Sequence, residues 1–506
     1  MFGGDPIGRQ RTGTIGIYPT GIIGIEEEAL ANRRHTGYRR RPWMLMNSLR
    51  AVRTWNVALV LWTVALPAKA VPADSPSIPE PGPPAADSPK RELPDYDGRG
   101  PRPTTAGEVA LWVPRVVLAP LYLTSEFILR RPLGALMTTA ERSGWPAVLY
   151  NFFTFGPEHN AGFAPIAFVD FGFLPAVGVY IFWSDAFFKG QSLHFHGSAW
   201  SGDWLAGSLT DRIEFATDKV ITLKVTGVRR PDHAFYGLGP NTLDRFRSRF
   251  GEDLLDGSAM LEVPFWRSSR VKVGAGVRAV SLYPGHYASD PSLEQRAAPS
   301  TFPVPDGFNR GYTEEYNYVL ASLDSRKDVA TGSGARVEVE AEQGTDVQRS
   351  PAASWIRYGA TAGVFYDLND YGRIVSLSAA ALFAEPLGNE PIPFTELVTL
   401  GGDRLMRGFV PGRLVDRSAA VATLRYRWPI AFILDGSIQA AVGNVFGVQL
   451  EQFKPGLLRF SGAVGVETVG STEGSFHALF GIGTETFDHG GQVDAIRFAI
   501  GTNRGF

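Results

Sequence analysis

The chemically most telling side chain of this sequence is an arginine in a glycine-rich turn. The turn reads LGGDRLMRGFVPG, from Leu400 to Gly412, and places Arg407 directly before a glycine and an aromatic residue. A guanidinium group stays charged at any relevant pH, and its planar fork can hold a carboxylate through two parallel hydrogen bonds. Arg407 is therefore a candidate for fastening this turn to an acidic partner, although charges in loops are usually only solvated.

Other candidate sites are weak. His194 and His196 lie two residues apart, so both imidazoles fall on one face of a strand. Two histidines without a third ligand more often form an ordinary pair than a metal site. The sequence contains no cysteine, and we find no nucleophile elbow, zinc-binding His-Glu-x-x-His or phosphate loop. We predict no metal, no cofactor and no enzymatic activity.

Bulk composition excludes two classes of protein. The formal net charge of −2 over 506 residues does not fit a strongly basic nucleic-acid-binding protein. The mean hydropathy is −0.05, which leaves no room for a large bundle of membrane-spanning helices. Charged residues make up 20% of the chain, below the value of about 25% that is usual for soluble domains.

The N-terminal region contains an export signal. From Met44 the sequence MLMNSLRAVRTWNVALVLWTVALPAKA has a basic start, an apolar core and a small-residue cleavage site, in that order. The apolar core is too short to span a bilayer. We assign residues 44–70 to a signal peptide, and residues 1–43 to a mis-called or non-structural extension ahead of the true start.

Two segments of different character follow the signal peptide. Residues 71–104 are rich in proline, cannot bury enough apolar surface to fold, and are predicted to form a disordered linker. Residues 105–148 mix large apolar residues with arginines and are interrupted by prolines, which predicts a short, broken, amphipathic helical segment. This segment could plug a pore, lie on a membrane surface or pack as a cap, and residues 71–148 could bind a periplasmic partner.

From about residue 162 onward the hydrophobic pattern has a period of two. The clearest examples are VITLKVT at 220–226, ARVEVEAE at 335–342 and ATLRYRW at 422–428. Such alternation predicts half-buried strands. On its own it does not distinguish a soluble sandwich from a membrane barrel.

The surrounding features favour a membrane barrel. The chain is exported, lacks cysteine, and ends at Phe506 in the same parity as Ile496, Phe498 and Ile500. In hydrocarbon only a closed barrel satisfies every backbone group of a sheet, and each spanning strand takes about 9–11 residues. We therefore predict an all-β fold, a transmembrane antiparallel β-barrel of about 16 strands over residues 162–506, in the bacterial outer membrane.

Several motifs of the barrel region resemble those of one family. The segment LGGDRLMRGF at 400–409, followed by LRYRWPI at 424–430, resembles the signature of the BamA/TamA-like outer-membrane assembly factors, the bacterial surface antigen family. In the same order, FYGLGPNT at 235–242 is similar to that family's aromatic-Gly-x-Gly-Asn turn, and LDSR at 323–326 to its Asp-x-Arg strand end. The resemblance spans roughly residues 220–506.

The resemblance implies roles for the residues of the glycine-rich turn. Arg407 would lie at the tip of a long extracellular loop that folds back into the barrel lumen, where it would meet acidic residues of neighbouring strands. Gly408 would permit close backbone approach and Phe409 would pack beside it. Gly401 and Gly402 would supply backbone angles that other residues reach only with strain.

Two expected acidic partners are missing from this sequence. The family usually has a glutamate at the position of Arg425 and an aspartate at the position of Ala441. By strand parity, Glu467 is our first substitute for the counter-ion of Arg407, and Asp435 is the second. A latch with a changed counter-ion and a loop that no longer latches both remain open at this point.

A further departure concerns the region before the barrel. Family members normally carry one or more soluble POTRA domains, but residues 71–161 contain no pattern of strands and helices that would form one. We therefore expect a variant without POTRA domains.

The resemblance implies that the protein inserts or translocates other proteins at the outer membrane, with unfolded outer-membrane proteins as clients and lipid as its surroundings. Two alternatives stay open: a channel or small-solute transporter that kept only the barrel, and a structural outer-membrane protein. No role in nucleic-acid binding is expected.

The family mechanism uses a weak seam between the first and last strands. We place the first strand within residues 163–171 and the last within 494–506, with Gly501, Gly505 and Phe506 as the candidate seam residues. Glycine weakens strand pairing. Replacing both glycines with valine is therefore expected to strengthen the seam.

Overall fold

The computed structural model describes residues 151–502 apart from 157, 216–217, 299–300, 328, 330–331, 350, 370–371, 432–433 and 469–475, together with isolated positions between 116 and 148. The predicted extension, signal peptide and linker, most of the helical segment 105–148, and Gly505 and Phe506 lie outside the described residues. Among the described residues, no helix combines the length and the apolar character needed to cross a membrane.

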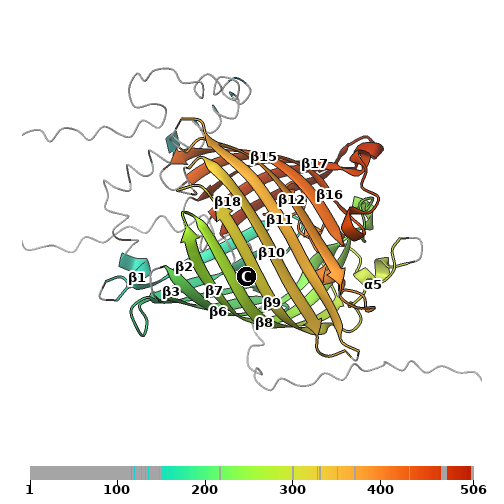
Figure 1. Ribbon diagram of the computed structural model, residues 1–506, viewed down its shortest axis with the longest axis horizontal. Helices are drawn as coiled ribbons and strands as arrows, with labels where there is room; N and C mark the ends of the chain where they lie inside the picture. Colours follow the sequence, from blue (N-terminus) through green and yellow to red (C-terminus); the bar gives the residue numbers. More distant parts are fainter. Residues whose placement is uncertain are drawn as a thin grey trace, which may run out of the picture. The chain divides into compact units, whose positions relative to one another are not determined.

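Sixteen antiparallel strands close into a barrel (Figure 1), as the alternating sequence pattern predicted. They are β2 (Ala161–Asp170), β3 (Ala176–Ser184), β4 (Gln191–Ser201), β5 (Trp204–Phe215), β6 (Lys219–Phe235), β7 (Ser248–Trp266), β8 (Ser269–Pro284), β9 (Tyr312–Asp324), β10 (Gly334–Asp346), β11 (Ala353–Asp367), β12 (Ile374–Pro386), β15 (Ser418–Ala431), β16 (Leu434–Phe446), β17 (Arg459–Thr468), β18 (Phe476–Thr484) and β19 (Val493–Thr502).

The remaining elements are short. They are β1 (Thr154–Phe155), β13 (Val398–Leu400), β14 (Leu414–Asp416), α5 (Leu293–Arg296), and the 3₁₀ turns η2 (Asp244–Phe246), η3 (Phe394–Glu396), η4 (Val448–Leu450), η5 (Pro455–Leu457) and η6 (Phe487–His489). Successive barrel strands pair with one another, and β12 pairs directly with β15 because β13 and β14 form a separate ribbon in the connection between them.

Side chains alternate between the two faces of the barrel wall. On β10, Val337 and Val339 are 47% and 52% exposed on the outer face. On the inner face, Glu342 forms an ion pair with Arg357 of the neighbouring strand. This arrangement of apolar side chains outside and charged side chains inside is the one that a barrel in lipid requires.

Short turns and long loops lie at opposite ends of the barrel. Connections such as 216–218 and 267–268 are short and lie at the end where the first strand begins and the last strand finishes. The longest connections, 285–311 and 387–417, lie at the other end, where outer-membrane barrels carry their extracellular loops.

The apolar core lies at the end of the barrel that carries the long loops. It joins buried residues of the connection 387–417, such as Phe394, Leu400 and Phe409, to wall residues such as Phe235 and Val445. Leu400 and Phe409 have no exposed surface. The long connection therefore folds inward against the wall.

The barrel closes where β19 meets β2, and this seam is short. It has three residue pairs, Ala499 with Asp170, Ile500 with Val169, and Gly501 with Phe168. The next shortest ladder of the barrel among the described residues, between β17 and β18, has seven pairs. Few hydrogen bonds therefore hold the first and last strands together.

The geometry at Gly501 reverses one expectation from the sequence. Gly501 has a φ of 152°, and a Cβ built there would overlap the carbonyl oxygen of Ala167 on the facing strand. The absence of a side chain thus allows the two strands to approach. A valine at this position would push them apart, so the expected strengthening of the seam by Gly501→Val is wrong.

We expect Gly501→Ala to destabilise the closed barrel, because overpacking costs about 1–3 kcal/mol. The measurement is the temperature at which the protein changes from folded to unfolded mobility on a gel. The control is Gly257→Ala on β7, where a Cβ would meet no atom within 4 Å. A transition temperature unchanged by Gly501→Ala, or lowered equally by both variants, would contradict the close approach at the seam.

Candidate functional site

The connection 387–417 between β12 and β15 has a structure of its own. Its η3 turn is followed by the two-stranded ribbon of β13 and β14, in which Val398 pairs with Asp416 and Leu400 with Leu414. Leu400 and Leu414 are fully buried. The ribbon therefore stiffens the base of the loop, and its apolar side chains hold the loop against the wall.

The tip of the loop is a tight turn. Gly401 and Gly402 have φ angles of 108° and 77°, in the left-handed region that favours glycine. The Gly401 amide donates to the carbonyl of Leu405 at 3.1 Å, and the Gly402 amide donates to the carbonyl of Phe409 at 2.9 Å. The two glycines thus bring Arg407, which lies between these acceptors, to the end of the turn.

The structure brings Arg407 and Glu467 together. Arg407 Nη1 lies 3.6 Å from Glu467 Oε2 on β17, and Arg407 Nε donates to the carbonyl of Asp403 at 2.7 Å. Glu467 also pairs with Arg425 of β15, which occupies the position where the family has an acid. Two guanidinium groups therefore share one carboxylate.

The surroundings of Arg407 lower the pKa of its guanidinium group. Burial and the neighbouring Arg425 lower the pKa of Arg407, while Glu467 and Asp403 act in the opposite direction. The second substitute partner named from the sequence, Asp435, instead pairs with Arg427 at 3.5 Å. Glu467 is thus the acidic group of the wall that the geometry offers to Arg407.

Gly408 and Phe409 lie directly against two wall strands. The amide of Gly408 donates to Ser461 Oγ on β17 at 2.8 Å. A Cβ at Gly408 would overlap the carbonyl oxygen of Ile482 on β18, and a Cβ at Gly483 would overlap the ring of Phe409. Glycine is therefore needed on both sides of this contact.

A buried arginine of the last strand, which the sequence reasoning missed, connects the loop to the seam. Arg497 Nη2 lies 2.8 Å from Asp170 Oδ2 on β2 and 2.7 Å from Asp403 Oδ1 in the loop. Its Nη1 donates to the carbonyl of Gly402 at 2.7 Å. Although burial alone would raise the pKa of Asp403, Arg497 and His477 lower it below the usual value. The sequence gives one hint of this role: Arg497 alternates with the apolar residues Ile496 and Phe498, so its side chain is expected to point into the lumen.

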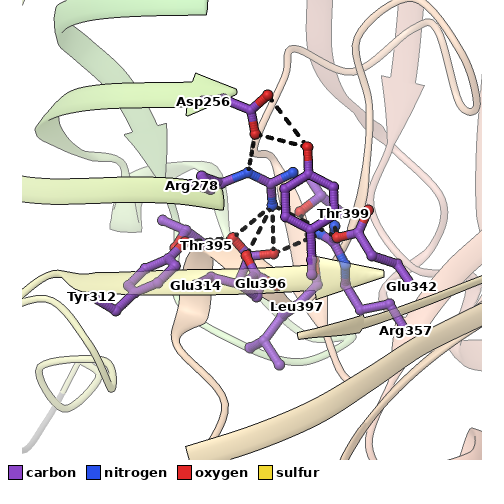
Figure 2. Close-up of polar contacts among 11 residues, drawn as sticks. Asp256, Arg278, Tyr312, Glu314, Glu342, Arg357, Thr395, Glu396, Leu397 and Thr399 are labelled. Atoms are coloured by element: carbon purple, nitrogen blue, oxygen red, sulfur yellow. Dashed lines mark hydrogen bonds and ion pairs between the residues drawn. The ribbon is translucent and has the colours of Figure 1, made fainter. Parts of the chain in front are cut away.

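A second ion-pair cluster holds the beginning of the loop (Figure 2). Glu396 Oε2 lies 2.9 Å from Arg357 Nη1 of β11 and 3.3 Å from Arg278 Nη1 of β8, and Tyr312 of β9 donates a hydrogen bond to the same carboxylate. Arg278 also reaches Glu314 Oε2 at 3.2 Å. The carboxylate is almost fully buried. It therefore ties the loop to the wall opposite the seam.

This cluster contains three glutamates but does not fit a metal site. Oxygen atoms of Glu314, Glu342 and Glu396 lie within 4.8 Å of one another. However, Arg278 contacts all three carboxylates and Arg357 contacts two of them. The guanidinium groups supply the positive charge that an ion would bring, so the cluster is a network of ion pairs.

The pair of histidines noted in the sequence belongs to a different part of the lumen. Tyr180 Oη lies 3.1 Å from His194 Nδ1, and the centroid of the Tyr180 ring lies 4.5 Å from that of the His196 ring. Among the described residues, neither histidine is part of a group of three metal-ligating side chains. The two imidazoles are therefore partners of a tyrosine.

The other family-like motifs also make structural contacts. Arg413 of the loop pairs with Asp494 of β19 at 2.6 Å and donates to Thr242 Oγ1 at 2.8 Å, at the end of the motif 235–242. In the motif 323–326, Asp324 and Arg326 pair at 2.6 Å. The first motif thus fastens a neighbouring extracellular loop to the long one, while the second stabilises a turn at the opposite end.

We expect Glu396 to make the closed loop sensitive to acid. Although burial alone would raise its pKa, Arg357, Arg278 and the Tyr312 hydroxyl lower it below the usual value. A carboxylate with a lowered pKa contributes its stability above the unfolded value of about 4.3, and loses it as the pH falls through the lower folded value. The loop should therefore resist protease from pH 8 to about 5 and become cleavable under more acidic conditions.

The variant Glu396→Gln should admit protease already at neutral pH, because breaking a buried ion pair costs about 3–5 kcal/mol. The matched control is Glu390→Gln in the same loop, whose partly exposed carboxylate pairs with Arg349. Such a pair contributes about 0–1 kcal/mol, so its loss should leave protection intact. Equal sensitivity of both variants would show that Glu396 does not fasten the loop.

The sequence matches one known family of protein domains. The Omp85 superfamily domain matches residues 248–502, about half of the chain. No protein among those with curated descriptions matches the sequence. Proteins of this superfamily are assembly or transport barrels and are not enzymes.

Two solved structures are similar to this chain at low sequence identity. BamA from Haemophilus ducreyi lacking POTRA domains 1–3 is 13% identical, with a TM-score of 0.48 over 68% of this chain and 70% of that one. CdiB from Acinetobacter baumannii is 11% identical, with a TM-score of 0.42 over 68% of this chain and 59% of that one.

The family assignment rests on the match of the domain, which includes the long loop and every wall strand from β7 to β19. The match also agrees with the motifs found in the sequence and with the closed barrel of 16 strands. This chain belongs to the Omp85 superfamily and is a β-barrel of the bacterial outer membrane.

Proposed function

We propose that this barrel inserts or translocates client proteins at the outer membrane, and that its long loop is a latch that controls the seam. The observation that carries the proposal is the position of Arg497. This side chain contacts Asp170 on the first barrel strand and Asp403 in the loop, and it belongs to the last strand itself. A movement of the loop would therefore change the contacts that hold the two seam strands together.

The short seam supports this function. An unpaired strand edge is a template for another strand, because its backbone groups have no partners. The three residue pairs between β19 and β2 leave much of both edges without a strand partner among the described residues. Unfolded outer-membrane proteins consist of amphipathic strands that need such partners during insertion.

The proposed latch consists of Arg407 with Gly408 and Phe409, and Gly401 and Gly402 shape its turn. Glu467 is its proposed counter-ion, since it is the carboxylate that reaches Arg407 from the wall. The shared use of Glu467 by Arg425 makes this contact weaker than an exclusive pair would be. A latch of this kind can hold the loop and still release it.

The alternative of a small-solute channel has less support. A channel needs an open lumen at both ends, whereas buried residues of the loop join a continuous apolar core with the wall at the extracellular end. The ion pairs of Glu396, Asp403 and Arg413 hold the loop in this place.

The test is the folding rate of an unrelated eight-stranded outer-membrane barrel into liposomes, read from heat-modifiable gel mobility. We expect liposomes that contain this protein to accelerate folding, and Arg407→Ala to reduce the acceleration about tenfold, which corresponds to about 1.4 kcal/mol of activation free energy. Arg407→Lys should not restore it, because lysine lacks the planar fork.

The control is Arg404→Ala, which removes an exposed arginine from the same turn. If the correctly folded protein gives no acceleration, the insertase proposal fails, and conductance across a planar bilayer would then test the channel. Equal losses in Arg404→Ala and Arg407→Ala would reject the specific role of Arg407.

A further inference from the structure

The outer wall of the barrel is hollowed over β5 to β9. A groove of about 630 Å³ crosses these strands on the face that an outer-membrane barrel turns toward lipid. This volume is within the range of about 300–1,000 Å³ that is usual for ligand-binding clefts. Leu209, Val225 and Val277 line the groove and are 51%, 53% and 49% exposed. The groove therefore opens away from the lumen and from the long loop inside it.

Small side chains on β7 and β8 produce the hollow. Gly257 of β7 lies between Val225 of β6 and Val277 of β8 in the strand register. A Cβ built at Gly257 would meet no atom within 4 Å. In the neighbouring outward-facing row, Ala259 of β7 lies opposite Ala275 of β8. The floor of the groove thus consists of backbone and methyl groups, and the valines stand above it.

The groove rises across the wall from β5 to β9. Asp211 lines its β5 end, and because β5 ends at Phe215, this is the fifth residue from the periplasmic end of the strand. Glu315 lines its β9 end, and because β9 ends at Asp324, this is the tenth residue from the periplasmic end. A strand spans the hydrocarbon in about 9–11 residues. Glu315 therefore lies at the depth of the lipid headgroups, while the rest of the groove lies at the depth of the acyl chains.

Polar side chains continue the β9 end of the groove along the outer face. Asn317 of β9 lies opposite Gln343 of β10, and its amide donates to Gln343 Oε1 at 3.5 Å. Thr345 of β10 lies opposite Glu315. Its hydroxyl accepts from Gln343 Nε2 at 2.8 Å and lies 3.0 Å from Ser354 Oγ. The amides and hydroxyls of this row therefore have partners among themselves.

The carboxylate of Glu315 differs from its neighbours. It forms no hydrogen bond and no ion pair with any residue that the structure describes. Two other carboxylates of the outer face are paired: Asp211 accepts from Gln191 Nε2 at 3.0 Å, and Glu385 forms an ion pair with Arg417. A charge beside hydrocarbon is costly unless it is paired. A cationic group from outside the chain would therefore stabilise Glu315.

We propose that this groove binds a membrane phospholipid with a primary ammonium headgroup. One acyl chain lies over Gly257, Ala259 and Ala275, and the ammonium group donates to the carboxylate of Glu315. Such a charge-assisted hydrogen bond is about twice as strong as a neutral one. Because surrounding lipid tails are as apolar as the groove, the bound chain adds only packing contacts. The headgroup therefore decides which lipid the groove selects.

The chemistry of Glu315 disfavours other phospholipid classes. Phosphatidylglycerol would place a net negative charge beside the carboxylate. Phosphatidylcholine has the same net charge as phosphatidylethanolamine, but its quaternary ammonium group has no hydrogen to donate. The site is also separate from the proposed insertase function, because β5 is the third strand after β2 and the groove extends away from the seam.

The test is native mass spectrometry of the full chain, released from detergent micelles that contain equal amounts of phosphatidylethanolamine and phosphatidylcholine with identical acyl chains. We expect bound phosphatidylethanolamine to exceed bound phosphatidylcholine about tenfold, the ratio that one hydrogen bond to a charged group produces. Glu315→Gln should abolish this preference, because it keeps the shape and removes the charge. Glu385→Gln is the matched control, since that lipid-facing carboxylate already has a partner, and it should keep the preference.

A second variant tests the groove itself. Gly257→Leu fills the hollow without steric overlap, so it should lower the retention of both lipids while the barrel keeps its folded gel mobility. Equal retention of the two lipids by the unmodified protein would overturn the inference. So would a preference that survives Glu315→Gln, or retention that Gly257→Leu leaves unchanged. These readouts involve no client protein, so a negative insertase assay would leave the lipid site standing.

Discussion

One buried guanidinium group, that of Arg497, joins the two strands at which this barrel closes. Backbone groups of a sheet in hydrocarbon have no water to pair with, so a barrel must join its first and last strands. Here the backbone ladder does so over three residue pairs, and Arg497 of β19 adds an ion pair to Asp170 of β2. The same side chain holds Asp403 of the long loop. The seam and the loop therefore share one electrostatic contact.

The loop is fastened at points spread around the wall. Glu396 binds the arginines of β8 and β11, Arg407 reaches β17, and Arg413 reaches β19. Buried ion pairs add little net stability compared with apolar packing, but removing one partner leaves an expensive uncompensated charge. Such contacts specify where the loop lies, while burial of the apolar core around Phe409 stabilises it there.

The architecture and part of the candidate site could be predicted from the sequence. Alternation of apolar and polar residues and the length of a spanning strand led to sixteen strands, and the turn at 400–409 led to the family. The partners of Glu396 and Arg497 could not be foreseen, because 118 and 94 residues separate Glu396 from Arg278 and Arg497 from Asp403. Such contacts depend on the register of many strands. The effect of Gly501 was misjudged because it depends on how closely Ala167 approaches.

The unequal edges of the seam also bear on how copies of the protein meet each other. If β19 of one molecule could pair with β2 of the next, each added copy would present a fresh edge, and the contact would propagate into an open chain of barrels. β1 already pairs with Ala161 and Gly162 on the edge of β2 that faces away from β3, and Pro165 faces the same edge without an amide hydrogen to donate, so this edge is a poor partner for such pairing. An open chain of barrels joined through these edges is therefore disfavoured.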